Sequence, residues 1–242
     1  MHKLISGEIY RLLHKKSMYA YFAALAAGYF ILAFIRSGGF NGESVVSDAM
    51  TMFSLLPALA GGFLFAAIYT DDLNSKNLIT LVGYGVKKAT VIIAKFLLAA
   101  LFGAVVYWLV PIYHILVYSL LGQTVTADAA AMVYAVSLKY LLVTLAYSAL
   151  SGIVAYGLQR ATFAIVTYLL LAFGVVGSLL AVALRTFAPG LAEHLVSAIT
   201  DGILLGVISG ARAAMPVLEY IVYLLAGLAL SAIAFNHKEM EF

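Results

Sequence analysis

The chain has 242 residues, of which 64% are hydrophobic and only 10% charged, with a mean hydropathy of +1.05. Because soluble domains carry roughly 25% charged residues, this composition excludes an ordinary soluble domain and predicts an all-α polytopic membrane protein. The net charge is only +3, and the sequence contains no cysteine. The missing cysteines exclude disulfides, cysteine-ligated metal sites and a catalytic thiol.

Residues 1–17 alternate apolar and charged side chains at helical spacing. The apolar residues recur on one side, and the other side carries Glu8, Arg11, Lys15 and Lys16. This pattern predicts an amphipathic helix that lies in the membrane interface. The alternative is a plain cytoplasmic extension of the first membrane span.

Six apolar stretches are long enough to cross a hydrocarbon core of ~30 Å at ~1.5 Å per residue. Prolines inside the second and third stretches, Pro57 and Pro111, predict kinks that a helix bundle tolerates. The whole chain, residues 1–242, is therefore expected to form one transmembrane domain. The expected spans are about 18–35, 49–69, 90–121, 132–158, 161–184 and 216–235.

Residues 70–90 form the longest polar interruption between two spans. A short apolar cluster follows Asp72 and Ser75, two residue types that cap helices, so a helix of one to three turns outside the bilayer is expected. A simple connection needs only a few residues, so the loop either contacts a partner or rests on lipid headgroups as a basic loop. Three apolar side chains are assigned to a partner groove, Leu78, Leu81 and Val82, with Ile79 beside them and Asp71, Asp72 and Lys76 at the rim.

Residues 185–215 contain two apolar pieces, 191–199 and 203–208, each too short to cross a membrane. Thr200-Asp201-Gly202 separates them. Short apolar helices broken by Gly and Asp predict a re-entrant hairpin between the fifth and sixth spans, dipping in from the outer face. The alternative is a single long, broken helix.

An even number of spans places both termini on one side of the membrane. Most lysines and arginines gather on that side, in the N-terminal segment and in residues 70–90. By the positive-inside rule, both termini and the 70–90 loop are expected to face the cytoplasm.

The sequence offers little sign of catalysis. The run Gly83–Thr90 has the residue types of a phosphate-binding loop at the wrong spacing, and H-E-x-x-H is missing. Three ionisable residues fall within the expected spans, where charge is costly: His114, Lys139 and Glu219. They either line a path or lock one conformation; alternatively, Lys139 and Glu219 extend to the outer interface.

Several features together resemble the ABC-2 family of transporter permeases. They are the charged N-terminal helix and the apolar run 78–82 followed by basic residues and Lys95, together with the broken hairpin before the last span and the basic tail Asn236-His237-Lys238. One departure is Ser75-Lys76-Asn77, which stands where family members carry Gly-Thr.

The resemblance implies a non-catalytic permease subunit of a bacterial cytoplasmic membrane exporter. It would pair with a second permease subunit, identical or different, and with two copies of an ABC ATPase that binds the ATP and Mg²⁺. The 70–90 loop and the N-terminal helix would rest in a cleft on the ATPase. Peptides or other amphiphilic compounds would pass between the two permease subunits, and no nucleic acid is expected as a partner.

The rival interpretation is a self-contained secondary transporter or an intramembrane enzyme. A secondary transporter is expected to carry paired acidic residues near the bilayer midplane and an inverted repeat, and the sequence displays neither. A purely structural scaffold would not need a basic loop that contains a helix.

Overall fold

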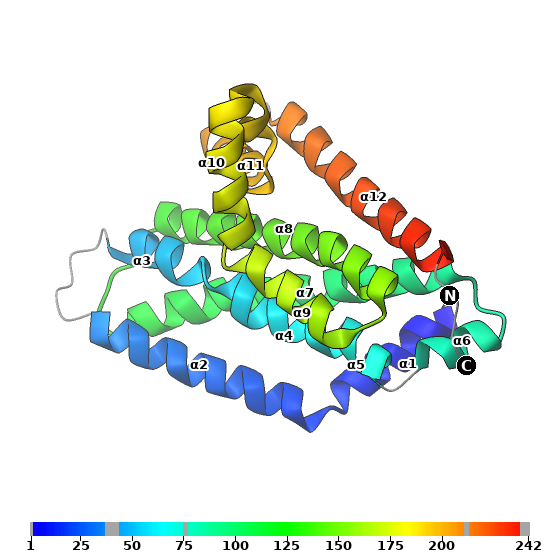
Figure 1. Ribbon diagram of the computed structural model, residues 1–242. Coiled ribbons are helices and arrows are strands. Elements are labelled where there is room, and N and C mark those ends of the chain that lie inside the picture. The colour runs from blue at the N-terminus through cyan, green and yellow to red at the C-terminus, as the bar shows by residue number, and fades with distance from the viewer. Residues whose placement is uncertain (1, 37–43, 75–76, 211–212, 238–242) are drawn as a thin grey trace.

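The computed structural model describes residues 2–36, 44–74, 77–210 and 213–237, and every regular element within these ranges is helical. Most of the helices lie side by side in a bundle (Figure 1). Five helical stretches are long and apolar enough to cross a membrane, or six if one bent pair of helices is counted as a span. The protein is therefore an all-α polytopic membrane protein.

The first two helices meet at a short break. α1 (His2–Leu13) carries the amphipathic pattern, and α2 (Lys16–Arg36) is the first span. The apolar side of α1 contacts the protein itself: Leu12 is fully buried, and Ile5 and Ile9 pack against the same core. α1 is thus fixed on the bundle by its apolar face.

The second span is assembled from short pieces and is the most buried of the spans. Its helix stops at Phe53, just ahead of Pro57, and two wide π-helical turns follow. Proline lacks an N–H and crowds the preceding turn, so a break at this place is the expected kink. The pieces are α3 (Ser44–Phe53), η1 (Pro57–Gly61), α4 (Gly62–Phe65), η2 (Ala66–Thr70) and α5 (Asp71–Asn74).

The third and fourth spans are the longest helices, α7 (Lys88–Leu120) and α8 (Ala127–Leu158). α8 begins five residues before the expected position 132, because the side chain of Thr126 caps it by accepting a hydrogen bond from the Ala129 N–H at 3.2 Å. Buried hydroxyls join the two helices: the Tyr107 hydroxyl lies 2.5 Å from Thr144 Oγ1.

The expected fifth span, 161–184, is not one straight helix. The chain forms α9 (Ala161–Ala172) and α10 (Val175–Phe187), which are bent by 59° relative to each other. Gly174 lies at the bend with φ 74°, a left-handed conformation that glycine adopts without a steric cost. α10 consequently leaves the bundle, as Figure 1 shows.

The expected break inside the hairpin is also displaced. η3 (Pro189–His194) is followed at once by α11 (Val196–Ser209), which runs straight through Thr200-Asp201-Gly202. Thr200 fits the helix because its hydroxyl donates to the Val196 carbonyl at 2.9 Å. Gly202 fits because a Cβ there would lie 3.1 Å from Pro216 Cγ, so the missing side chain lets α11 approach the start of α12 (Ala214–His237) closely.

One end of the bundle brings together helices from three distant parts of the sequence. α1, α5, α6 (Asn77–Gly83) and the last turn of α12 lie together there (Figure 1). Lys88, at the start of α7, donates a hydrogen bond to the Phe235 carbonyl of α12 at 2.7 Å. We call this region the α1 end.

Candidate functional site

Lys95 is the centre of a buried cluster of charged residues at the α1 end. It lies on the second turn of α7 with only 1% of its side chain exposed. Its Nζ is 2.9 Å from Glu8 Oε2 and also pairs with Asp72, itself 1% exposed. Because a buried charge is costly unless it is paired, Lys95 is stable here only while α1 and α5 both remain in place.

Arg11 makes a second set of connections beside Lys95. Its guanidinium lies 2.8 Å from Glu8 Oε2 and 3.2 Å from Asp71 Oδ2, and it donates to the Ala67 carbonyl at 3.1 Å. Lys15 also pairs with Asp71. The planar fork of an arginine suits such multiple contacts, so α1 is tied to the end of the second span at several points.

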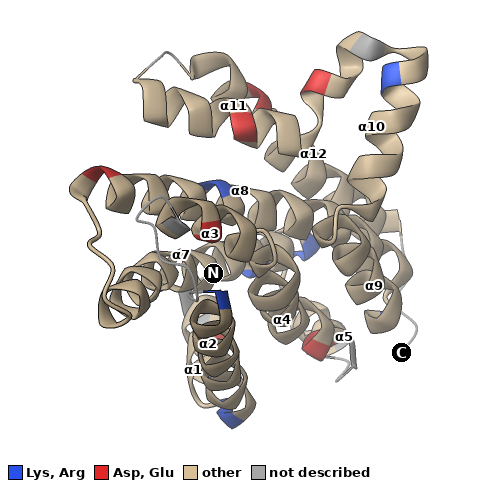
Figure 2. Ribbon diagram, turned by 90° about the vertical axis from the view of Figure 1, so that its left-hand side faces the viewer, with Lys and Arg blue, Asp and Glu red and all other residues tan. Residues whose placement is uncertain are grey.

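The surroundings of Glu8 and Arg11 favour the charged forms of both side chains. Burial alone would raise the pKa of the Glu8 carboxyl, but Lys95 and Arg11 outweigh burial and hold that pKa below its ordinary value. Burial alone would lower the pKa of Arg11, whereas Glu8 and the two aspartates raise it. Charged residues are sparse along most of the bundle (Figure 2). The Lys95 cluster (Glu8, Arg11, Lys15, Asp71, Asp72 and Lys95) is therefore an unusual concentration of charge for this protein.

The structure revises the expected roles of two loop residues. Asp72 is not at an exposed rim, because it is buried against Lys95. Leu78 is only 5% exposed and belongs to the protein's own core together with Leu12 and Phe235, so it is not available to a partner groove. The reason is that α6 lies against the bundle and uses its apolar side internally. Leu81 and Val82 are half-buried.

For two other residues of the expected partner surface, the structure does not describe the side chain. Lys76 falls outside the described residues, and so does the side chain of Ile79. Lys16 is described and exposed at the start of α2, and it is not among the residues that the ion pairs above join.

Sequence reasoning missed Tyr84, which follows α6 and is 84% exposed. Its backbone is fixed by a hydrogen bond from the Tyr84 N–H to the Thr80 carbonyl at 3.0 Å, and the next turn is closed by Val86 N–H to Leu81 O at 3.2 Å. The sequence did contain a pattern that indicates an exposed side chain here, because Tyr84 stands between two glycines in a polar loop. Lys95 also had a signal, since a lysine within an apolar span requires a partner.

His114 does not line an open path, because it is fully buried near the opposite end of the bundle. Its Nε2 donates to the Val45 carbonyl at 3.0 Å, and its Nδ1 hydrogen-bonds with the Tyr29 hydroxyl. Beside it, Arg36 lies 2.7 Å from Asp48 Oδ1, joining the end of α2 to α3. His114 therefore contributes to holding α2, α3 and α7 together.

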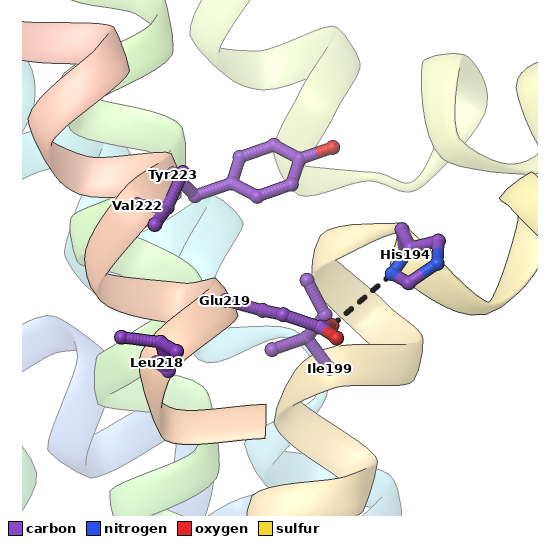
Figure 3. A pocket seen from close by; sticks show the side chains of 6 residues that line it. All are labelled: His194, Ile199, Leu218, Glu219, Val222 and Tyr223. Atoms are coloured by element: carbon purple, nitrogen blue, oxygen red, sulfur yellow. Dashed lines mark hydrogen bonds and ion pairs between the residues drawn. The ribbon is translucent and has the colours of Figure 1, made fainter. Parts of the chain in front are cut away.

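Lys139 and Glu219 do not pair with each other. Lys139 of α8 lies 2.5 Å from Asp201 of α11, and Glu219 of α12 lies 3.2 Å from Nδ1 of His194 in η3. Figure 3 shows the second pair beside a small cavity of about 280 Å³ with a mainly apolar wall. Both pairs connect the hairpin segment, η3 and α11, to a neighbouring span.

Across the described residues, no three His, Asp or Glu side chains come together in a way that could hold a metal ion. Compared with models of known protein families and with curated proteins, the chain matches none.

Proposed function

We propose that this protein is the permease subunit of an ATP-driven exporter of the ABC-2 type, working as a dimer with two copies of a separate ATPase. The observation that carries this proposal is the Lys95 cluster. It joins α1, the end of the second span (α5) and the start of the third span through buried ion pairs. A push on the loop would therefore move two spans, rather than being absorbed by a flexible connection.

The partner surface that we propose differs from the one expected from sequence. Its centre is Tyr84, since Leu78 is buried within the protein. Thr80 and Lys87 are exposed near it in the sequence. Tyrosines are enriched among the few residues that dominate protein interfaces, and an exposed basic residue at the rim would set orientation. This surface would face the cytoplasm, as the basic residues of the loop favour.

The location of the cluster favours coupling over secondary transport. A secondary transporter is expected to bind its ions near the middle of the bilayer. The Lys95 cluster instead lies at the α1 end, where α5 ends the second span and α6 follows it. The cargo, peptides or other amphiphilic compounds, follows only from the resemblance to ABC-2 permeases.

The test first isolates the chain from its native membrane together with any ABC ATPase that co-purifies with it, and then reconstitutes the two; the absence of such an ATPase would itself contradict the proposal. Tyr84→Asp should insert with normal stability because Tyr84 contacts little of the protein itself. It should nevertheless lose the stimulation of ATP hydrolysis by roughly tenfold or more, as expected for the loss of an interface anchor. Tyr84→Phe, which keeps the ring, is the matched control and should retain coupling. Wild-type ATP hydrolysis and transport in Tyr84→Asp would rule out this partner surface.

A further inference from the structure

α2 is attached to the bundle at two levels and leaves a slot beside α7. Nearer its start, the Tyr21 hydroxyl donates to the Leu59 carbonyl at 3.0 Å, and the Tyr21 ring stacks on Phe63. Farther along, the Tyr113 hydroxyl of α7 donates to the Ala26 carbonyl at 2.8 Å. A cavity of about 450 Å³ lies between α2 and α7, where α2 runs along one side of the bundle in Figure 1.

The length of this slot corresponds to one leaflet of a bilayer. Its lining extends from Met18 to Tyr29 on α2 and from Phe102 to Tyr113 on α7. Each stretch covers about 17 Å of helix, close to half of a hydrocarbon core of ~30 Å. The slot begins at the junction of α1 and α2, so it belongs to the leaflet on the side of the α1 end.

The shape of the slot suits a chain-like ligand. It extends along both helices for ~17 Å and has a volume of about 450 Å³. An alkyl chain, which is long, thin and apolar, matches a slot of this shape.

The lining offers little to a polar ligand. The hydroxyls of the three tyrosines that line the slot are engaged elsewhere: Tyr19 donates to the Leu13 carbonyl at 2.6 Å, Tyr113 to Ala26, and Tyr29 pairs with His114. The other lining residues are apolar. A peptide would leave its backbone groups unsatisfied here, which is costly, whereas a hydrocarbon chain would not.

The mouth of the slot is basic. Lys16 is the first residue of α2, is exposed, and stands one turn before Tyr19, which lines the slot. Lysines next to a membrane span attract anionic lipid headgroups. We propose that the slot holds one acyl chain of an anionic phospholipid, with its phosphate beside Lys16. This inference does not rest on the proposed exporter function.

The test measures retained lipid by native mass spectrometry. The full-length chain is taken from nanodiscs of equal phosphatidylglycerol and phosphatidylcholine. We expect retained phosphatidylglycerol in the wild type, and Ala26→Trp should lower it about tenfold, because the indole would occupy the slot. Ala27→Trp, on the neighbouring exposed position, is the matched control and should retain lipid. Leu109→Trp fills the slot from α7 and guards against a folding defect peculiar to Ala26→Trp.

The headgroup is tested by Lys16→Gln. The preference for phosphatidylglycerol over phosphatidylcholine should fall about fivefold, the factor expected for one lysine near anionic lipid, while total retained lipid changes less. Equal retention of phosphatidylglycerol in wild type, Ala26→Trp and Leu109→Trp would overturn the placement of an acyl chain in the slot. An unchanged preference in Lys16→Gln would overturn the headgroup assignment. Loss of lipid in Ala27→Trp as well would indicate general lipid coating and would also overturn the proposal.

Discussion

Ion pairs join helices both at the α1 end and at the hairpin segment, but the two sets are built differently. At the α1 end, Lys95 and Asp72 are each 1% exposed and pair with each other. Lys95 also pairs with Glu8, and Asp72 also lies near Arg11. In the hairpin pairs one member is exposed and the other partly covered: Asp201 is 52% and Lys139 18% exposed, and His194 is 55% and Glu219 31% exposed. Buried charges cannot separate without a large desolvation cost, whereas exposed pairs contribute little. We therefore expect a rigid joint at the α1 end and a reversible contact at the hairpin.

The largest expected effect comes from breaking the rigid joint. Lys95→Met would remove the buried cation that Glu8 and Asp72 share and leave Arg11 as their remaining partner, and removing one partner of a buried pair costs about 3–5 kcal/mol. The free energy of unfolding in mixed detergent should fall by that amount. The double variant Lys95→Met with Asp72→Leu should recover part of the loss. A loss below about 1 kcal/mol in Lys95→Met would contradict a rigid joint.

A smaller loss of stability is expected at low pH, where protonation of Glu8 would weaken the ion pairs at the α1 end. The pKa of Glu8 is held below its ordinary value of 4.5 by Lys95 and Arg11. A carboxyl with a lowered folded pKa stabilises the protein above that ordinary value and loses its contribution as the pH falls through the folded pKa. The wild type should therefore lose stability below about pH 4.5, and Glu8→Gln should lose less over the same range. Parallel acid profiles for both proteins would contradict an ionised Glu8.

The smallest effect is expected at the hairpin. A double-mutant cycle with Lys139→Met and Asp201→Asn should give a coupling of about 0.2–1 kcal/mol, the usual range for exposed pairs. The cycle that combines Lys139→Met with Glu219→Gln should be additive, because these residues have different partners. A Lys139–Asp201 coupling above about 2 kcal/mol would mean that the pair is shielded from water, and the contrast between the two regions would fail.

The spans were largely predictable because hydrophobic length alone determines them. The expected third span, 90–121, differs little from α7, Lys88–Leu120. The charged residues of α1 and the loop were also identified. Their pairing was not, because Arg11 and Asp71 are 60 residues apart in the chain and only the packed bundle brings them together. The burial of Leu78 was missed for the same reason, since a short apolar face has the same pattern whether it meets a partner or its own protein.

The position of the break in the hairpin segment was mispredicted for a local reason. Thr200-Asp201-Gly202 has the composition of a helix break, yet the structure continues the helix there and breaks it at Leu195. Composition does not reveal that the Thr200 hydroxyl donates to the preceding turn of the helix. Nor does it reveal that Pro216 packs closely against Gly202. The bend at Gly174 shows the converse: one glycine within a continuous apolar run ends a helix when the following segment packs in another direction.

The bend at Gly174 has a consequence for how the chain enters the membrane during synthesis. α9 contains 12 residues, so it is about 18 Å long and cannot by itself cover a hydrocarbon core of ~30 Å. A helix of this length is not released into lipid by itself as a spanning segment. α9 therefore reaches its place in the membrane together with the helices that it contacts, α8 and the pieces of the second span. Its integration is coupled to segments made earlier, rather than decided by its own hydrophobicity.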